Sequence, residues 1–170
     1  LDIMCAGAFS VSNDSDLKWV YFLDGLKDGD NNIAALIRCN DMLRQTFADS
    51  EHYQNYSVIM KNELIFRKSG MVVGDKFFYD NYCTYQNTDF ETWRKQSFES
   101  NTWQLFPLEE IDTGERTFQA MTFSYPVRNY IQQEPEANAV VQFLLSKENL
   151  EQMFGQLLSR QGGILIYGAE

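Results

Sequence analysis

The chain has 170 residues, of which 44% are hydrophobic, and its formal net charge is -10. This length is enough to bury one core, so we expect a single domain with small appendages at most. The excess of negative charge opposes binding to nucleic acid and to anionic membrane surfaces. No stretch approaches the roughly 20 consecutive apolar residues of a membrane-spanning helix, so we expect any membrane anchor to lie outside these residues.

The residue types that usually build catalytic or metal sites are scattered. Cys5, Cys39 and Cys83 form no C-x-x-C pair, and we interpret them as small buried hydrophobic residues. His52 is the only histidine, and no nucleophile motif accompanies it, so a histidine-based triad is not indicated. These four residues also lack the spacing of zinc ligands. We therefore predict no catalysis, no metal and no cofactor.

The amino-terminal part of the chain is predicted to be helical after a short tail. Residues 1–13 are interpreted as the tail, and residues 12–15 offer several caps for a helix over about 16–26. A second helix is predicted over 32–47. Apolar residues repeat along it at helical spacing, at Ile33, Leu36, Ile37, Leu43 and Phe47. This face either lies across a sheet or pairs with a copy of itself, and the second arrangement would make a homodimer through the amino-terminal helices.

Two short apolar runs, 56–60 and 64–66, are rich in β-branched and aromatic residues and predict a hairpin. The residues between them allow a tight turn in which Asn62 takes a positive φ. Residues 70–74 then lead into an irregular segment that is dense in aromatic side chains, at Phe77, Phe78, Tyr79, Tyr82 and Tyr85. So many rings in so short a segment either fill a core or line a pocket.

A helix is predicted over 88–99. Thr88 and Glu91 have the spacing of a capping box, in which the hydroxyl accepts from the amide three residues on and the carboxylate reaches back. The helix carries Trp93 and Arg94. The guanidinium of Arg94 either faces solvent beside an acidic neighbour on the same helix, or it faces a pocket, where it would suit a carboxylate.

Three strands are predicted to follow as an antiparallel meander, over 102–111, 115–127 and 139–146. In the second of them bulky side chains alternate with mostly small ones, so its two faces differ. Ser146 then caps a helix with an apolar face, and a short strand at 164–167 is predicted to begin a module that these residues do not complete. The result is an α+β fold whose five-stranded antiparallel sheet has the first hairpin beside the last strand.

This order of elements resembles the Cache type of extracytoplasmic sensor domain, a relative of PAS domains. Blocks 56–60, 78–79, 88–94 and 139–146 look like the corresponding blocks in ectodomains of membrane-bound AraC-type transcription regulators. The resemblance implies a PAS/Cache-like five-stranded antiparallel sheet with N-terminal helices and a crossing helix. It also implies a location on the extracytoplasmic face of a bacterial cell membrane, as the ectodomain of a transcription regulator or signal transducer.

The resemblance divides the chain into a tail over 1–13, a Cache-like sensor module over 14–146, and a crossing helix with the first strand of an incomplete second module over 147–170. It implies binding of a small molecule without catalysis, and contact with a membrane only through segments outside this chain. Two alternatives stay open. One is a non-catalytic dimerisation or protein-interaction module without a ligand pocket, and the other is the ectodomain of a sensor histidine kinase.

The resemblance places a ligand pocket between the aromatic segment and the 88–99 helix on one side and the small-residue faces of two strands on the other. The candidate lining residues are Tyr79, Trp93, Arg94, Trp103 and Tyr125, and Arg128 is a second candidate charge partner. Rings with hydroxyl and indole donors suit a small molecule that has a carboxylate or a planar ring. No arginine precedes Trp93 at the spacing of the amino-acid-sensing members, so the ligand class stays open.

Overall fold

The computed structural model describes residues 2–20, 29–47, 53–127 and 137–158. In chain order, the helices and strands within these ranges are α1 (Asp2–Asn13), α2 (Ser15–Val20), α3 (Gly29–Phe47), β1 (Asn55–Met60), β2 (Leu64–Arg67), β3 (Gly70–Val73), α4 (Asp75–Tyr82), β4 (Thr84–Tyr85), α5 (Phe90–Glu99), β5 (Gln104–Asp112), β6 (Thr117–Val127), β7 (Ala139–Ser146) and α6 (Lys147–Leu158). The fold is therefore of the predicted α+β class.

The seven strands form one antiparallel sheet in the order β3-β2-β1-β7-β6-β5-β4. The predicted position of the first hairpin beside the last strand is confirmed. Val58 of β1 pairs with Phe66 of β2 on one side and with Val141 of β7 on the other. All 8 residues of β7 are buried, because this strand lies inside the sheet and is covered on both faces.

The sheet has more strands than the five predicted from the sequence. The chain turns back at Lys68 and Ser69 so that β3 pairs with β2, and Gly70 after the turn has a φ of 135°, which side-chain-bearing residues rarely adopt. β4 has only 2 residues and pairs with the end of β5. β4 is too short for an alternating pattern to mark it in the sequence, and β3 begins at Gly70 and is followed by Gly74, residues that are typical of a loop.

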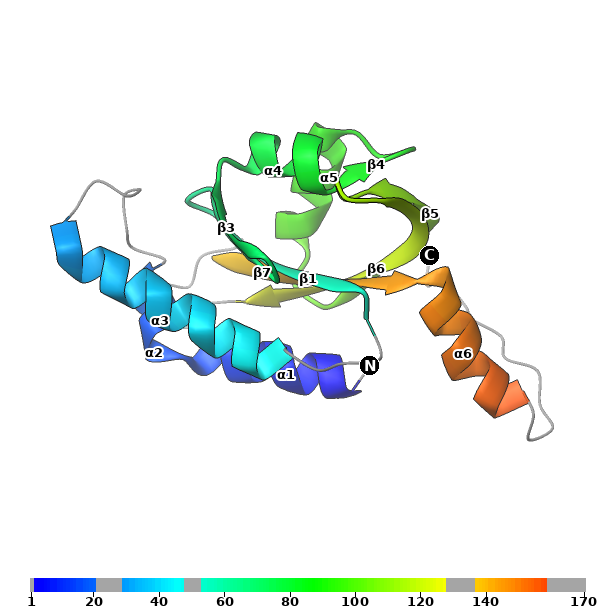
Figure 1. Cartoon of the computed structure of the whole chain (residues 1–170), viewed down its shortest axis with the longest axis horizontal. Coiled ribbons are helices and arrows are strands. Elements are labelled where there is room, and N and C mark those ends of the chain that lie inside the picture. Colours follow the sequence, from blue (N-terminus) through cyan, green and yellow to red (C-terminus); the bar gives the residue numbers. More distant parts are fainter. Residues whose placement is uncertain (1, 21–28, 48–52, 128–136, 159–170) are drawn as a thin grey trace.

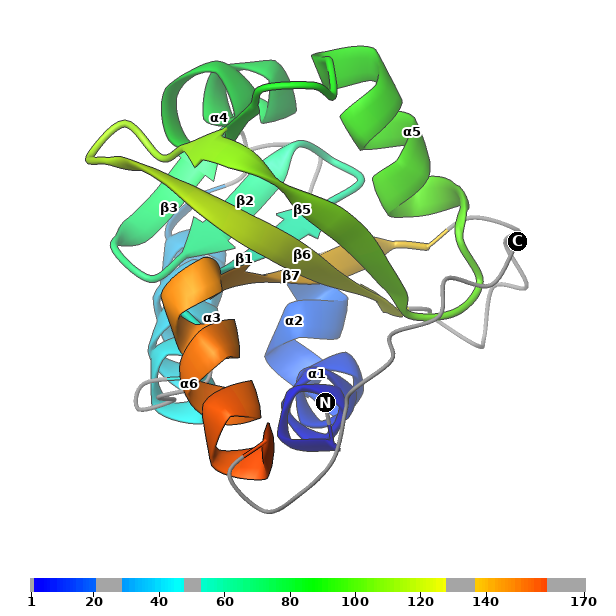
Figure 2. The same cartoon turned by 90° about the vertical axis from the view of Figure 1, so that its right-hand side faces the viewer.

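Helices cover both faces of the curled sheet (Figures 1 and 2). α1, α2 and α3 lie on one face, and α4 and α5 lie on the other. α6 begins directly after β7 and leaves the sheet on the side of α1–α3 (Figure 1). The buried side chains accordingly divide into two clusters, one on each face of the sheet.

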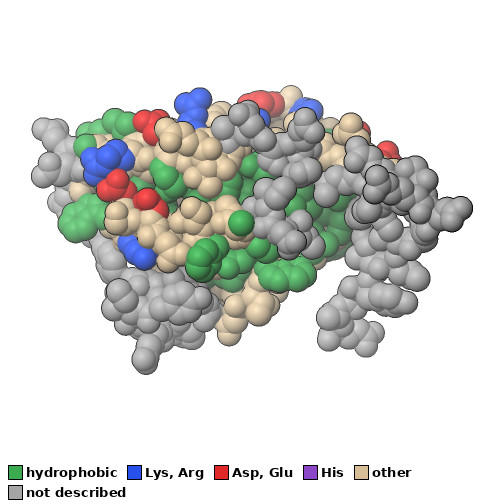
Figure 3. Space-filling model, turned by 90° about the horizontal axis from the view of Figure 1, so that it is seen from below, with side chains coloured by type: hydrophobic (Ala, Val, Ile, Leu, Met, Phe, Trp, Pro, Cys, Tyr) green, Lys and Arg blue, Asp and Glu red, His purple; other side chains and the backbone are tan. Residues whose placement is uncertain are grey.

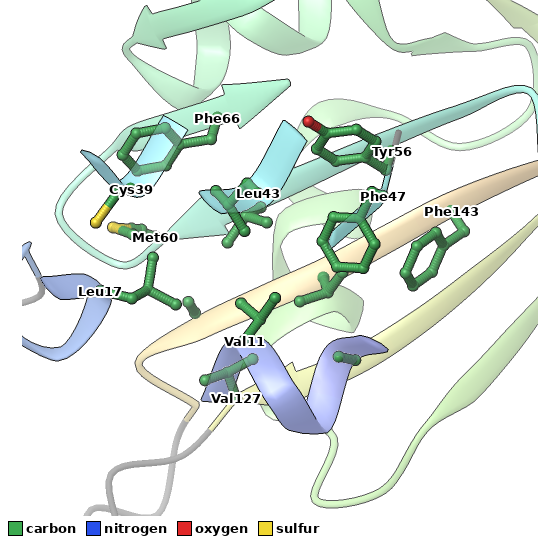
Figure 4. Packing of buried hydrophobic residues seen from close by; sticks show 14 of the residues in the cluster. Val11, Leu17, Cys39, Leu43, Phe47, Tyr56, Met60, Phe66, Val127 and Phe143 are labelled. Atoms are coloured by element: carbon green, nitrogen blue, oxygen red, sulfur yellow. The ribbon is translucent and has the colours of Figure 1, made fainter. Parts of the chain in front are cut away.

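The buried cluster between α1–α3 and the sheet, here called the α1–α3 core, is centred on aromatic rings (Figure 4). The ring of Phe47, at the end of α3, lies against those of Tyr56 and Phe143, at centroid distances of 4.8 and 5.2 Å. Val11 of α1 and Leu17 of α2 are fully buried in the same cluster. Side chains from all three helices therefore share one core with β1 and β7.

The predicted tail at 1–13 is instead largely helical, because it contains α1. Met4, Ala8 and Val11 are buried in the α1–α3 core at the i, i+4, i+7 spacing of one helix face. Apolar residues also lie on the other side of α1, where Phe9 is 61% exposed, so the sequence shows little contrast between faces. Only residues 16–20 of the helix predicted over 16–26 can be compared, and they lie in α2. The rest of that predicted helix lies outside the described residues.

α3 confirms the predicted helix, but only part of its predicted apolar face is buried. Leu36 and Leu43 are buried as predicted, and Cys39 is buried with them, whereas Ile33 and Ile37 are 55% and 54% exposed. Apolar residues occupy more of the circumference of α3 than one neighbouring layer can cover. Helical spacing alone therefore did not select the buried stripe.

The turn between β1 and β2 is confirmed, but the positive φ belongs to Glu63, at 66°, and not to Asn62. Asn62 stabilises the turn with its side chain instead. Its Oδ1 accepts from the amide of Leu64 at 3.3 Å, and its Nδ2 donates to the carbonyl of Val20 at 3.0 Å. The side chain of Asn62 thus ties the hairpin to the end of α2.

The aromatic segment that was predicted to be irregular forms helix α4. Gly74, with a φ of 94°, precedes it, and the amide of Cys83 donates to the carbonyl of Tyr79 where it ends. Phe78 and Tyr79 are buried on its inner side, while Phe77 is 54% exposed. Rings lie on both the buried and the exposed face of this helix. The sequence therefore lacks the periodic alternation of apolar and polar residues by which a helix is usually predicted.

α5 confirms the predicted helix, but the predicted capping box is wrong by one residue. Asp89 caps the helix, and its Oδ1 accepts from the amide of Thr92 at 2.8 Å. The hydroxyl of Thr88 donates to Glu109 of β5 at 3.0 Å instead. The sequence did not distinguish the two candidates, because Asp caps a helix as well as Thr does. The bond from Thr88 to Glu109 joins residues far apart in the sequence, so the local pattern does not indicate it.

β5 has an irregularity between Phe106 and Glu109 that reverses the direction of its side chains. Leu105 packs against the α1–α3 core, whereas Ile111, which has the same parity, is buried on the opposite face. Pro107 lies at the irregularity and has no amide hydrogen for the ladder. The bulge directs Glu109 toward the segment before α5, where its carboxylate accepts from the amide of Asn87 and from the hydroxyl of Thr88.

The start of α6 is as predicted. The hydroxyl of Ser146 accepts from the amide of Asn149 at 3.2 Å, as an N-cap residue does. Leu150 packs partly against the α1–α3 core. The strand predicted at 164–167 lies outside the described residues.

Candidate ligand-binding site

The space between α4, α5 and the sheet is filled by aromatic side chains. We call this group the aromatic layer; its members are Phe78, Tyr79, Tyr85, Phe90 and Trp93. Tyr79 contacts rings on both sides, with centroid distances of 5.4 Å to Trp93 and 6.3 Å to Tyr85. Such tilted and offset pairs are favourable beyond the area that they bury. The structure therefore brings together Tyr79 and Trp93, two of the predicted site residues.

The aromatic layer faces the small-residue side of β6. Ala120 and Thr122 are fully buried on this side, and Phe123 is buried in the α1–α3 core on the other. The hydroxyls of Thr122 and Tyr85 are 2.8 Å apart and share a hydrogen bond. The predicted difference between the two faces of β6 is thus confirmed, and the small side chains leave room for the rings.

A chain of buried hydrogen bonds connects α5 to the centre of the sheet. Nε2 of Gln142, on β7, donates to the hydroxyl of Ser97 at 2.9 Å, and that hydroxyl donates to the carbonyl of Trp93 at 2.7 Å. Exposed fractions are only 1% for Gln142 and 2% for both Ser97 and Trp93. The bonds fix the position of α5 over β7 and the orientation of the Gln142 amide.

In the residues that form this chain of hydrogen bonds, two buried polar atoms lack a partner among the described residues. They are Nε1 of Trp93, which is a donor, and Oε1 of Gln142, which is an acceptor. A buried polar group without a hydrogen bond costs about 1–3 kcal/mol, so such groups usually have a partner. An acceptor at the indole nitrogen and a donor at the amide oxygen would satisfy these two atoms.

Arg94 does not have the neighbours that the sequence indicated. Its Nε donates to Oδ2 of Asp75, at the start of α4, rather than pairing with an acidic residue on α5. The side chain of Asp75 is only 9% exposed, whereas that of Arg94 is 35% exposed. The guanidinium also lies over the ring of Phe98, 5.3 Å from its centroid. Arg94 thus connects α4 and α5, and a bound carboxylate would have to compete with Asp75.

The remaining candidate residues are not brought together with Tyr79 and Trp93. Trp103 is 49% exposed and lies against Phe123, at a centroid distance of 5.8 Å. Tyr125 packs partly against the α1–α3 core, on the same face of β6 as Phe123. The sheet separates both residues from the aromatic layer, because alternate strand residues face opposite sides. Arg128 lies outside the described residues.

Burial keeps the polar hydrogens of the aromatic layer in place. It raises the pKa of Tyr85 well above its usual value and that of the Cys83 thiol to about 12. It also raises the pKa of Tyr79, whose hydroxyl donates to the carbonyl of Thr88. At neutral pH these groups are therefore neutral hydrogen-bonding groups rather than ionised nucleophiles.

Sequence reasoning missed the polar residues that accompany the rings. Gln142 is a polar residue inside the apolar run of 139–145, a strand that was itself predicted to be central. A glutamine at such a position must be satisfied by a partner, which is a signal that the sequence does carry. Ser97 gives no comparable signal, because a serine on a helix is usually exposed.

A scan against models of known protein families finds no match, and a search among curated proteins finds no similar chain. In the part of the chain that the structure describes, no helix combines the length and the apolar character needed to cross a membrane. No group of three or more potential metal ligands occurs within the described ranges.

Proposed function

We propose that this chain is an extracytoplasmic small-molecule-sensing domain of Cache type, part of a membrane-bound transcription regulator or signal transducer of a bacterial cell. The observation that carries the proposal is a pair of buried polar atoms without a partner among the described residues, Trp93 Nε1 on α5 and Gln142 Oε1 on β7. The arrangement of a curled antiparallel sheet, amino-terminal helices on one face and a helical excursion on the other supports it.

The ligand is a small molecule with a carboxylate or a planar ring. One of its atoms accepts a hydrogen bond from Trp93 Nε1, and a donor group reaches Gln142 Oε1. The rings of Tyr79 and Tyr85 supply apolar walls, and their hydroxyls are already engaged by Thr88 and Thr122. A planar group between rings is a usual mode of recognition in sites lined by aromatic side chains.

Signalling would proceed through β7. Gln142 lies on this strand, and α6 begins directly after it, at Lys147. A ligand that engages Gln142 favours one arrangement of β7 and α6 over another, and so biases the segment over 147–170, which we propose as a crossing helix that leads into a second module. No catalysis is needed for this role.

Thermal-shift screening of amino acids, short carboxylates and aromatic metabolites tests the proposal. Trp93→Phe removes the indole donor but keeps an aromatic ring, and Gln142→Leu removes the acceptor. Both variants should lose the stabilisation that a ligand gives to the unsubstituted protein. Trp103→Phe is the matched control, because its exposed ring lies outside the aromatic layer. Hits that stabilise all three variants equally would place the ligand elsewhere.

A second candidate function is dimerisation through the amino-terminal helices. Large apolar side chains are exposed on α1, α2 and α3, at Phe9, Trp19, Ile33 and Ile37. Figure 3, which views the molecule from the side of these helices, shows hydrophobic side chains at that surface. Apolar patches of this kind often mark interaction sites.

Sedimentation measurements distinguish this candidate. Ile33→Glu combined with Ile37→Glu should convert a dimer into a monomer, because two carboxylates would be buried in the interface. Val73→Glu, on β3, is the control, since Val73 is similarly exposed, at 53%, but lies outside α1–α3. A chain that is monomeric without any substitution, at concentrations well above those in the cell, would argue against this function.

A further inference from the structure

Arg67, at the end of β2, is an arginine with few interactions. The residue is only 8% exposed, and its guanidinium lies over the ring of Tyr82, 3.8 Å from the centroid. Its single ion pair among the described residues is with Glu115, where Nη2 and Oε1 are 3.8 Å apart. That distance is too long for a hydrogen bond. A largely buried guanidinium therefore has donors that the described residues do not satisfy.

The guanidinium lines a cavity of about 200 Å³. The turn after β2 contributes Lys68, and the turn between β5 and β6 contributes Glu115 and Arg116. β2 and β6 are not neighbours in the sheet, and the curl of the sheet brings their ends together (Figure 2). The cavity thus exists only when the sheet is fully formed.

The charge of this cavity is opposite to that of the whole chain. Three cationic side chains, Arg67, Lys68 and Arg116, face one carboxylate, that of Glu115. No carboxylate of the described residues forms an ion pair with Lys68 or Arg116, and the Glu115 side chain is 77% exposed. The chain as a whole has 24 acidic and 14 basic residues, so a cavity lined by three cations and one carboxylate departs from the average.

We propose that this cavity binds a small carboxylate-bearing molecule, with Arg67 as the residue that recognises the carboxylate. The planar guanidinium fork matches the two oxygens of a carboxylate, and the charge-assisted hydrogen bonds of such a pair are stronger than neutral ones. The ring of Phe118, which also lines the cavity, provides an apolar contact for the rest of the molecule. The residues of this site do not overlap with Trp93 or Gln142, so the inference does not depend on the proposed function.

Glu115 makes the proposal sharply testable, because its carboxylate competes for the same guanidinium. If the cavity binds carboxylates, Glu115→Gln should tighten binding by roughly three- to fivefold, since a nearby like charge is removed. Arg67→Gln should weaken it by about tenfold or more, and Arg116→Gln by a smaller factor. Arg38→Gln should leave it unchanged, because Arg38 lies on α3 and pairs with Asp16.

The experiment measures thermal unfolding during titration with acetate, succinate, citrate and benzoate at constant ionic strength, with sodium chloride as the balancing salt. We expect a saturable rise in Tm with at least one of these carboxylates, and the stated order of affinities among the variants. The absence of any saturable rise overturns the proposal. A rise in Tm that persists unchanged in Arg67→Gln also overturns the proposal. So does an affinity that does not increase in Glu115→Gln, because Glu115 would then not compete with the carboxylate for Arg67. If Arg67→Gln does not fold, the exposed Glu115→Gln and Arg116→Gln variants decide the result.

Discussion

Arg94 of α5 pairs with Asp75 at the start of α4, and this contact holds together the two helices that carry the aromatic layer. Asp75 is nearly buried, so its carboxylate depends on the guanidinium for compensation. The pair also explains why the rings of two separate helices stay in contact.

Arg94→Met should destabilise the protein by about 1–3 kcal/mol, because it leaves the Asp75 carboxylate without its cation in a place of limited solvation. Equilibrium unfolding in urea measures the difference. Arg38→Met is the matched control, since Arg38 of α3 and Asp16 of α2 form an exposed ion pair, and exposed pairs contribute little to stability. Equal losses in the two variants would mean that the Arg94 pair is no stronger than a surface contact.

Trp93→Ala should cost about 3–5 kcal/mol, because the side chain is 98% buried and its removal leaves a cavity under α5. Trp93→Phe should cost less than half as much, since it keeps a ring and removes a donor that lacks a partner among the described residues. Urea unfolding without ligand gives both values. Similar losses in the two variants would indicate that the indole N–H contributes to stability.

The cysteines should differ in reactivity toward a thiol-specific reagent at pH 8. Burial raises the pKa of Cys39 and Cys83 to about 12, so both thiols remain protonated and covered. Cys5 is only half-buried and should react first. Absorbance titration should therefore detect one accessible thiol in the folded protein and three after denaturation. Rapid labelling of Cys83 in the native protein would contradict the packing around it.

The cap of α5 should make the stability of the protein depend on pH in acid. The amide of Thr92 holds the pKa of Asp89 below its usual value, so the folded state favours the ionised carboxylate. The resulting stabilisation is complete above the unfolded pKa of about 3.9 and is lost as pH falls through the lower folded pKa. Asp89→Asn keeps a capping side chain and should remove this part of the acid dependence.

The measurement is Tm as a function of pH between pH 2 and pH 6, a range that includes the unfolded pKa of Asp89 and extends well below it. Glu91→Gln is the control, because Thr88 does not form the predicted capping box with Glu91 and instead donates to Glu109. A larger change in the acid dependence for Glu91→Gln than for Asp89→Asn would restore the capping box that the sequence indicated.

The sequence predicted those parts of the fold that repeat a local pattern. The hairpin at Val58 and Phe66, the two faces of β6 and the cap at Ser146 all follow from neighbours a few residues apart. The helix α4 was missed because its rings lie on both faces. The buried side of α3 was predicted only in part, because Ile37 and Cys39 are both apolar and only the tertiary packing distinguishes them.

The candidate site was predicted only in part, for a related reason. Tyr79 and Trp93 meet because both point away from solvent on consecutive helices. Tyr125 was assigned to the same pocket although alternation along β6 places it with Phe123, on the opposite face. The partner of Arg94 is distant in sequence, and spacing along α5 carries no information about it. Local patterns thus identify the residues of a layer but not the contacts between layers.

The position of β7 has a consequence for how the chain acquires its structure. Asn55 at the start of β1 pairs with Leu144 of β7. The edge of β1 that faces the middle of the sheet is therefore covered only after β7, the last strand, has formed. Until residues 139–146 have been synthesised, β1 and β6 each expose an unpaired apolar edge, which favours association with other chains. Folding should therefore be slow relative to helical proteins of this size, and a nascent chain released before Ala139 should aggregate rather than fold.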